Sequence, residues 1–84
     1  MEDEPQMLYN ILEKYVGIKL YKEDQDKFKK EFFDTLFEPY EPVDYSTRTT
    51  MLINAILEED NLPFVFSIRE DHSHKHYWIL LDLR

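Results

Sequence analysis

The sequence predicts an α+β fold in which three helices are followed by a C-terminal antiparallel β-hairpin. Apolar residues recur at helical spacing in residues 5–16, 22–37 and 46–59. From residue 64 onwards, apolar residues alternate along the chain with a period of two, as in strands that bury one face. A chain of 84 residues can build only one hydrophobic core, so we expect a single domain over residues 1–84.

The first predicted helix occupies about residues 5–16. Pro5 suits the first helical position, and Asp3 or Glu4 would cap it. The apolar stripe of this helix consists of Leu8, Ile11, Leu12, Tyr15 and Val16. Gly17, the only glycine, follows the stripe directly, where a left-handed residue commonly ends a helix. We therefore expect the helix to end near Val16.

The second predicted helix begins around Lys22, with Glu23 and Asp24 in a first turn where the helix dipole favours acids. Its apolar side chains recur every four residues, at Phe28, Phe32 and Leu36. Two prolines follow within residues 38–45, and each removes a backbone donor and pushes its predecessor into an extended conformation. We expect this segment to form a stiff connector.

The third predicted helix runs from a cap at Asp44 or Ser46 to about Glu59. Residues 51–57 are apolar on nearly every side, so this helix should be largely buried. Residues 60–63 break it. Two strands should follow, over Phe64–Arg69 and over about eight residues from His76, with a polar turn from Glu70 to Lys75 between them.

The composition favours a protein partner over nucleic acid or lipid. The formal net charge is −8, from 18 acids and 10 bases, and this charge opposes binding to phosphates or to an anionic membrane. A partner with a basic surface is favoured instead, although an acid excess also serves solubility alone. No apolar run approaches the ~18 residues of a membrane span, and the acidic N-terminus is unlike a signal peptide. With no cysteine, we expect a soluble protein of the cytoplasm.

The sequence shows no set of residues typical of an enzyme. A single glycine excludes the glycine-rich loops that hold nucleotides, and adjacent acids such as Glu58 and Glu59 diverge around a helix. No nucleophile stands beside a base in a recognisable pattern. We therefore expect neither catalysis nor a cofactor.

Our first hypothesis is a non-catalytic interaction module, an acidic adaptor or inhibitor. Rows of carboxylates can imitate DNA phosphates, and small phage-borne inhibitors of DNA-acting host enzymes resemble this chain in size and charge. The residues expected to supply charge are Glu23, Asp24, Asp26, Glu31, Asp34, Glu38 and Glu41. The residues nominated as anchors for the partner are Tyr40, Tyr45 and Trp78, because large amphipathic rings often anchor interfaces. For Trp78 the alternative is burial, since tryptophan is strongly buried on average.

The second hypothesis follows from the layout of residues 45–83. Ser46-Thr47-Arg48-Thr49-Thr50 opens the third helix, and an acidic turn then leads into the hairpin. This layout resembles winged helix-turn-helix domains, and it implies a winged-helix-like fold. The resemblance implies that Ser46, Thr47, Arg48 and Thr50 face a DNA groove. It also implies that the turn from His72 to Lys75 forms the wing tip.

On this second hypothesis the protein is a DNA-binding regulator of transcription or replication. A homodimer would set the spacing of its half-sites, and Arg48 and Lys75 would be the critical bases. Helices that enter a groove normally present several bases, whereas this one offers Arg48 alone. A winged-helix topology used for protein contacts therefore fits the sequence better than one used for DNA.

His72, His74 and His76 form an H-x-H-x-H pattern. On an extended strand these side chains would point to one side and could share a zinc or nickel ion. The pattern lies in a predicted turn with no cysteine nearby, so we expect no metal site and a solvated hairpin tip instead. Below a pH of about 6.5 the three histidines would add positive charge and make partner binding sensitive to acid.

Overall fold

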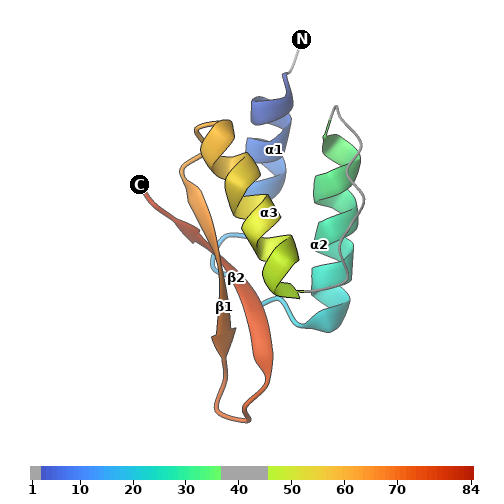
Figure 1. The fold of residues 1–84 in the computed structure, drawn as a ribbon, viewed down its shortest axis with the longest axis vertical. Helices are drawn as coiled ribbons and strands as arrows, with labels where there is room; N and C mark the ends of the chain where they lie inside the picture. The colour runs from blue at the N-terminus through green and yellow to red at the C-terminus, as the bar shows by residue number, and fades with distance from the viewer. Residues whose placement is uncertain (1–2, 37–45) are drawn as a thin grey trace.

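Three helices precede a two-stranded antiparallel sheet, which confirms the predicted α+β layout (Figure 1). The computed structural model describes residues 3–36 and 46–84. The elements are α1 (Glu4–Glu13), α2 (Lys22–Thr35), α3 (Ser46–Glu59), β1 (Phe64–Glu70) and β2 (His76–Asp82). The hairpin runs beside the helices, and its tip extends beyond them. No helix in the described ranges has the length and apolar character needed to cross a membrane.

Helix α1 starts where the sequence predicts but ends three residues early. The Asp3 side chain caps it by accepting a hydrogen bond of 2.9 Å from the backbone N–H of Gln6. The last α-helical residue is Glu13, not Val16. The predicted end is wrong because Val16 forms a β-bridge with Leu80.

Residues 16–20 pair with the free edge of β2. The backbone N–H of Gly17 donates to the carbonyl oxygen of Leu80 at 2.9 Å. Leu20 and Trp78 exchange two backbone hydrogen bonds, of 2.7 and 2.9 Å. Strand β2 therefore lies between β1 on one side and this segment on the other, and the pairing ties the link between α1 and α2 to the hairpin.

Helix α3 is less buried than its apolar sequence predicts. Its inner residues Ile53, Ile56 and Leu57 belong to the core, but Met51 is 65 % exposed and Ala55 is exposed as well. The prediction of a largely buried helix is wrong for Met51 and Ala55, because α3 packs on the hairpin and core through one face only. The Asn54 side chain accepts from the backbone N–H of Phe66 at 2.7 Å and donates to its carbonyl oxygen at 2.9 Å. The Asn54 amide thus provides hydrogen-bond partners for the Phe66 backbone groups, which point away from β2.

The core lies between the helices and one face of the sheet. Leu8 and Leu12 of α1 and Phe28 and Phe32 of α2 are fully buried, as their spacing predicts. The sheet contributes Phe64, Phe66, Trp78 and Leu80 to the same cluster. Phe66 packs its ring against Phe28 and Trp78, with ring centroids 4.9 and 5.9 Å apart. The hairpin register pairs Phe66 with Leu80 and Ile68 with Trp78, so these residues share the inner face.

Trp78 is therefore a core residue and not a surface anchor. Only 2 % of it is exposed, and the expectation that it contributes an exposed ring to a partner interface is wrong. The physical reason is that both faces of β2 are apolar. The sheet turns the Trp78 and Leu80 face towards the helices, which leaves Ile79 and Leu81 on the other side.

Candidate functional site

Five of the nominated acids lie on α2, and they differ in exposure and in their contacts. Glu23, Asp24 and Asp34 are exposed. Asp26 is exposed but pairs with Lys29, with 3.3 Å between the carboxylate oxygen and the ammonium nitrogen. The nominated Glu38, Glu41, Tyr40 and Tyr45 lie outside the described residues.

Glu31 is engaged within the protein. Its carboxylate forms an ion pair with the Lys14 ammonium and accepts a hydrogen bond of 2.6 Å from the Tyr15 hydroxyl. These two contacts, Lys14 first, lower the pKa of the Glu31 carboxyl. Burial and then the Glu31 contact raise the pKa of Tyr15 to about 12. Glu31 thus joins the end of α1 to α2, which leaves it a poor candidate for meeting a partner.

A group of acids that the sequence did not bring together lies where α1 begins and α3 ends. We call Asp3, Glu4, Glu59 and Asp60 the acidic end. Burial comes first among the causes that raise the pKa of the Asp60 carboxyl, followed by the negative charges of Glu4 and Glu59, a side-chain hydrogen bond with Glu4 and the negative charge of Asp3. One Asp60 carboxylate oxygen, Oδ2, is buried without a hydrogen-bond partner in the described structure. Some 55 residues separate the two halves of this group, so no local pattern could have revealed it.

The opposite end of the molecule carries the hairpin tip, which is exposed but tightly organised. One carboxylate oxygen of Asp71 accepts hydrogen bonds from the backbone N–H groups of Ser73 at 2.8 Å and Lys75 at 3.0 Å. The other oxygen accepts a 2.7 Å hydrogen bond from the Tyr21 hydroxyl. The Tyr21 bond and then the backbone bonds lower the pKa of the Asp71 carboxyl. Asp71 thereby fixes the turn and ties it to the start of α2.

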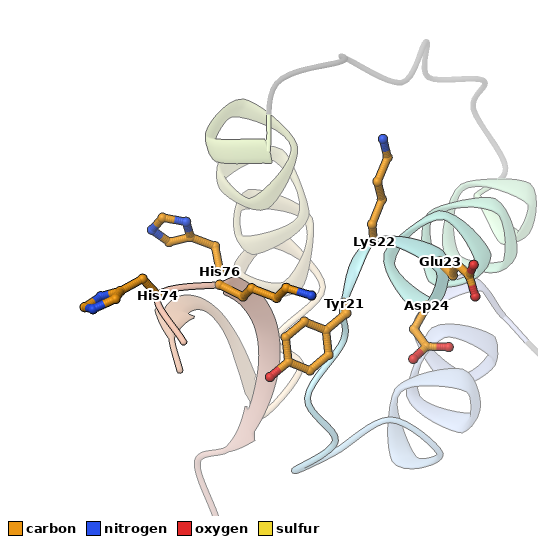
Figure 2. A pocket seen from close by; sticks show the side chains of 7 residues that line it. Tyr21, Lys22, Glu23, Asp24, His74 and His76 are labelled. Carbon is orange, nitrogen blue, oxygen red and sulfur yellow. The ribbon is translucent and has the colours of Figure 1, made fainter. Parts of the chain in front are cut away.

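An open hollow of about 530 Å³ lies between the start of α2 and the hairpin tip (Figure 2). Its lining residues are Tyr21, Lys22, Glu23, Asp24, His74, Lys75 and His76. Figure 2 shows the two histidines on the hairpin side and the two carboxylates on the α2 side. Two lysines and two acids balance in charge at neutral pH, so the hollow has no strong preference for either sign of ligand.

One of the residues nominated for DNA binding is buried. Thr50 is only 5 % exposed, so the implied contact between Thr50 and a DNA groove is wrong. Thr50 is buried because it lies on the inner side of α3, and its neighbour Thr49 is buried as well. Arg48 at the start of α3 and Lys75 at the hairpin tip are exposed. Ser46 and Thr47 belong to the first turn of α3, and their side chains are outside the described set.

The three histidines do not line one face of a strand. His72 and His74 lie in the turn, and only His76 belongs to β2. His74 has a positive φ of 63°, and its ring nitrogen Nδ1 lies 2.7 Å from the Glu70 carboxylate. Within residues 3–36 and 46–84, no group of three histidine, cysteine or acidic side chains is arranged to hold a metal ion.

No protein-family model, curated protein or solved structure matches this chain.

Proposed function

We propose that this domain is a non-catalytic interaction module that binds a partner with a basic surface, as an adaptor or an inhibitor. The observation that carries the proposal is the crowding of carboxylates at the acidic end. Burial first, and then the neighbouring acids Glu4, Glu59 and Asp3, raise the pKa of the Asp60 carboxyl. Like charges held together raise the free energy of the unbound protein, and a cationic partner relieves that repulsion on binding.

The arrangement of the helices concentrates negative charge at this end. Figure 1 shows the start of α1 and the ends of α2 and α3 on the side away from the hairpin tip. Asp34, the second-last residue of α2, is therefore on the same side as the acidic end and is exposed. Glu23 and Asp24 begin α2 at the opposite side, beside Lys22 and Lys75. Carboxylates spaced on rigid helix ends suit a lysine- or arginine-rich surface, including one that normally binds DNA phosphates.

The test uses a fluorescently labelled oligolysine peptide and fluorescence anisotropy. We expect salt-sensitive binding to the wild-type protein, and Glu59→Lys should weaken it about 3- to 5-fold, as expected for reversing one exposed charge. Glu23→Lys is the matched control, because it makes the same change of charge at the opposite end. Equal weakening by both variants would show that net charge alone drives binding and would overturn the proposed location. Absence of binding at low salt would overturn the proposal itself.

A second candidate, a winged-helix regulator that binds DNA, is favoured by one feature of the topology. The order is helix, paired segment, helix, helix and hairpin, with β2 in the middle of the paired strands. Lys22, Arg48 and Lys75 belong to the start of α2, the start of α3 and the hairpin tip, which lie towards the same end in Figure 1. Those are the elements with which a winged helix would meet a duplex.

The same anisotropy measurement with a labelled mixed-sequence duplex separates the two candidates. Proteins that contact phosphates lose affinity steeply between ~50 mM and ~200 mM salt. If the first proposal holds, the duplex should not bind at either salt concentration. Salt-sensitive duplex binding that is lost in Lys75→Glu and kept in Glu59→Lys would replace it with the DNA-binding candidate.

A further inference from the structure

The face of the hairpin that points away from the helices is apolar. Side chains alternate along each strand, so Val65, Ile79 and Leu81 lie opposite the inner-face residues. None of these three belongs to the core cluster or to the side chains packed against it. The backbone N–H of Leu83 donates to the Pro63 carbonyl oxygen at 2.9 Å, which extends the ladder by one pair. Leu83 therefore continues the Leu81 face, and it is 65 % exposed.

This outer face contains no acidic residue. We define it as Val65, Ser67, Arg69, Tyr77, Ile79, Leu81 and Leu83. The chain as a whole has 18 acids and a net charge of −8, so an acid-free face departs from the rest of the protein. Solvent-facing strand positions are normally polar, and contiguous apolar side chains in such positions mark interaction surfaces.

Only part of the outer face is covered within the protein. Tyr77 is buried because the Lys19 ammonium lies 5.2 Å from the centre of its ring and the Tyr21 ring centre lies 5.6 Å away. The other apolar residues of the face remain partly or largely exposed, and they are Val65, Ile79, Leu81 and Leu83. They form a strip from the middle of the hairpin towards its open end.

We propose that a second copy of this chain packs on this strip, sheet against sheet, to form a two-fold symmetric dimer. Two copies of net charge −8 repel each other, and contact through most surfaces would place carboxylates against carboxylates. Contact through the outer face lets the two copies bury apolar side chains without bringing carboxylates together. The inference goes beyond the proposed function and does not rest on it, because no residue of the acidic end belongs to the outer face.

Charge placement supports an antiparallel arrangement of the two hairpins. Arg69 is the one charged residue of the outer face and lies near the hairpin tip. When the strands of the two copies run in opposite directions, each Arg69 lies over the open end of the other hairpin, where the outer face carries no charged side chain. The two arginines then lie near opposite ends of strands about 23 Å long, well beyond the ~8–10 Å over which salt leaves charges coupled.

The size of the strip limits the strength of the dimer. Two paired strands are only about 10 Å wide, and with a length of about 23 Å their footprint is well below the ~800 Å² per partner of a standard interface. We therefore expect dissociation constants in the micromolar to millimolar range. Added salt should strengthen the dimer, because it screens the repulsion between two acidic chains.

Sedimentation equilibrium of the wild-type protein, from about 10 μM to about 1 mM, tests the proposal over the expected range of affinity. The expected result is a concentration-dependent dimer that Leu81→Glu abolishes. Leu83→Glu places the same charge at a largely exposed position and should also abolish it, so a folding defect in the first variant does not decide the outcome. Ala55→Glu is the matched control, since it adds one carboxylate to the exposed face of α3, and it should leave the dimer intact.

Two results would overturn the inference. A wild-type protein that stays monomeric at the highest concentration shows that the strip does not hold a second copy. In that case, binding of the protein to phosphatidylcholine vesicles, which carry no net charge, would assign the strip to lipid instead if Leu81→Glu abolishes it. A dimer that survives both Leu81→Glu and Leu83→Glu shows that the copies meet through another surface.

Discussion

The Tyr21 hydroxyl donates a 2.7 Å hydrogen bond to the carboxylate of Asp71, fifty residues further along the chain. Tyr21 immediately precedes α2, and Asp71 begins the hairpin turn. The same carboxylate accepts the backbone N–H groups of Ser73 and Lys75. One acid therefore shapes the turn and attaches it to the helical part, which gives an exposed tip a defined conformation.

We predict that Asp71→Ala releases the hairpin tip without unfolding the domain. Hydrogen exchange of the Ser73 and Lys75 amides, followed by NMR, should accelerate because both amides lose their acceptor. Tyr21→Phe should accelerate it less, since it removes only the link to α2. Ser73→Ala keeps the backbone donor and serves as the control. Unchanged exchange in Asp71→Ala would contradict the role that we give to this carboxylate.

The next prediction concerns the contact between Asn54 and β1. Asn54→Ala leaves the backbone N–H and carbonyl of Phe66 without their partner at a partly buried position. Such groups cost roughly 1–3 kcal/mol each when they are left unsatisfied, so we expect a loss of at least about 1 kcal/mol in the free energy of unfolding. Urea denaturation measures this loss. Ala55→Ser, a small polar change at the neighbouring exposed position, should cost less than about 0.7 kcal/mol, which is the range of helix propensity among ordinary residues.

Asn54→Asp refines the test. A carboxylate can still accept from the Phe66 N–H but cannot donate to its carbonyl oxygen. At low pH the protonated carboxyl regains a donor, so the free energy of unfolding of Asn54→Asp should lie between those of the wild type and Asn54→Ala. At neutral pH the free energy of unfolding of Asn54→Asp should be lower than at low pH. The same stability at both pH values would show that the two hydrogen bonds do not act together.

The sequence was sufficient to predict the order and type of the elements because those depend on local spacing. The caps and faces of α1 and α2 are examples, since Asp3, Phe28 and Phe32 act as their positions predict. The end of α1 could not be found in this way, because Val16 leaves the helix to pair with Leu80, distant in sequence. The side of β2 that faces the core was also undetermined, because Trp78 and Ile79 are both apolar.

The candidate sites were harder to predict for the same reason. The acidic end joins two segments that are about 55 residues apart. Only the fold brings Glu4 close enough for its charge to raise the pKa of Asp60. Glu31 is on α2 as predicted, but the turn after α1 supplies the lysine and the tyrosine that engage it. A helical wheel shows that a side chain points outward, and it does not show which other element meets it there.

A third prediction concerns pH. The contacts to Lys14 and Tyr15 lower the pKa of Glu31, so the stability that they contribute is present above the ordinary value of ~4.3 and is lost as the pH falls through the lowered pKa. The pKa of Tyr15 is raised to about 12, so its contribution is present below ~10 and is lost as the pH rises through about 12. Tyrosinate absorbance during alkaline titration should show a late step that Tyr15→Phe removes. A late step that persists in that variant would contradict the assignment.

The last prediction isolates backbone conformation at Gly17, where the chain leaves α1 and meets β2. Gly17 has a φ of +76°, and a Cβ atom added there would meet nothing within 4 Å. Gly17→Ala should therefore lower the free energy of unfolding by about 1–2 kcal/mol through the strain of the left-handed conformation alone. Gly17→Asn should cost less, because asparagine tolerates that region.

Chemical synthesis of this short chain provides a matched control for steric effects. D-alanine has the same side chain as L-alanine but favours positive φ, so a D-alanine at position 17 should keep or raise the stability measured by urea denaturation. Equal losses with the two alanines would mean that the methyl group itself is not accommodated. Because the Gly17 N–H donates to Leu80, the strained L-alanine variant should also show faster exchange of that amide, whereas the D-alanine variant should not.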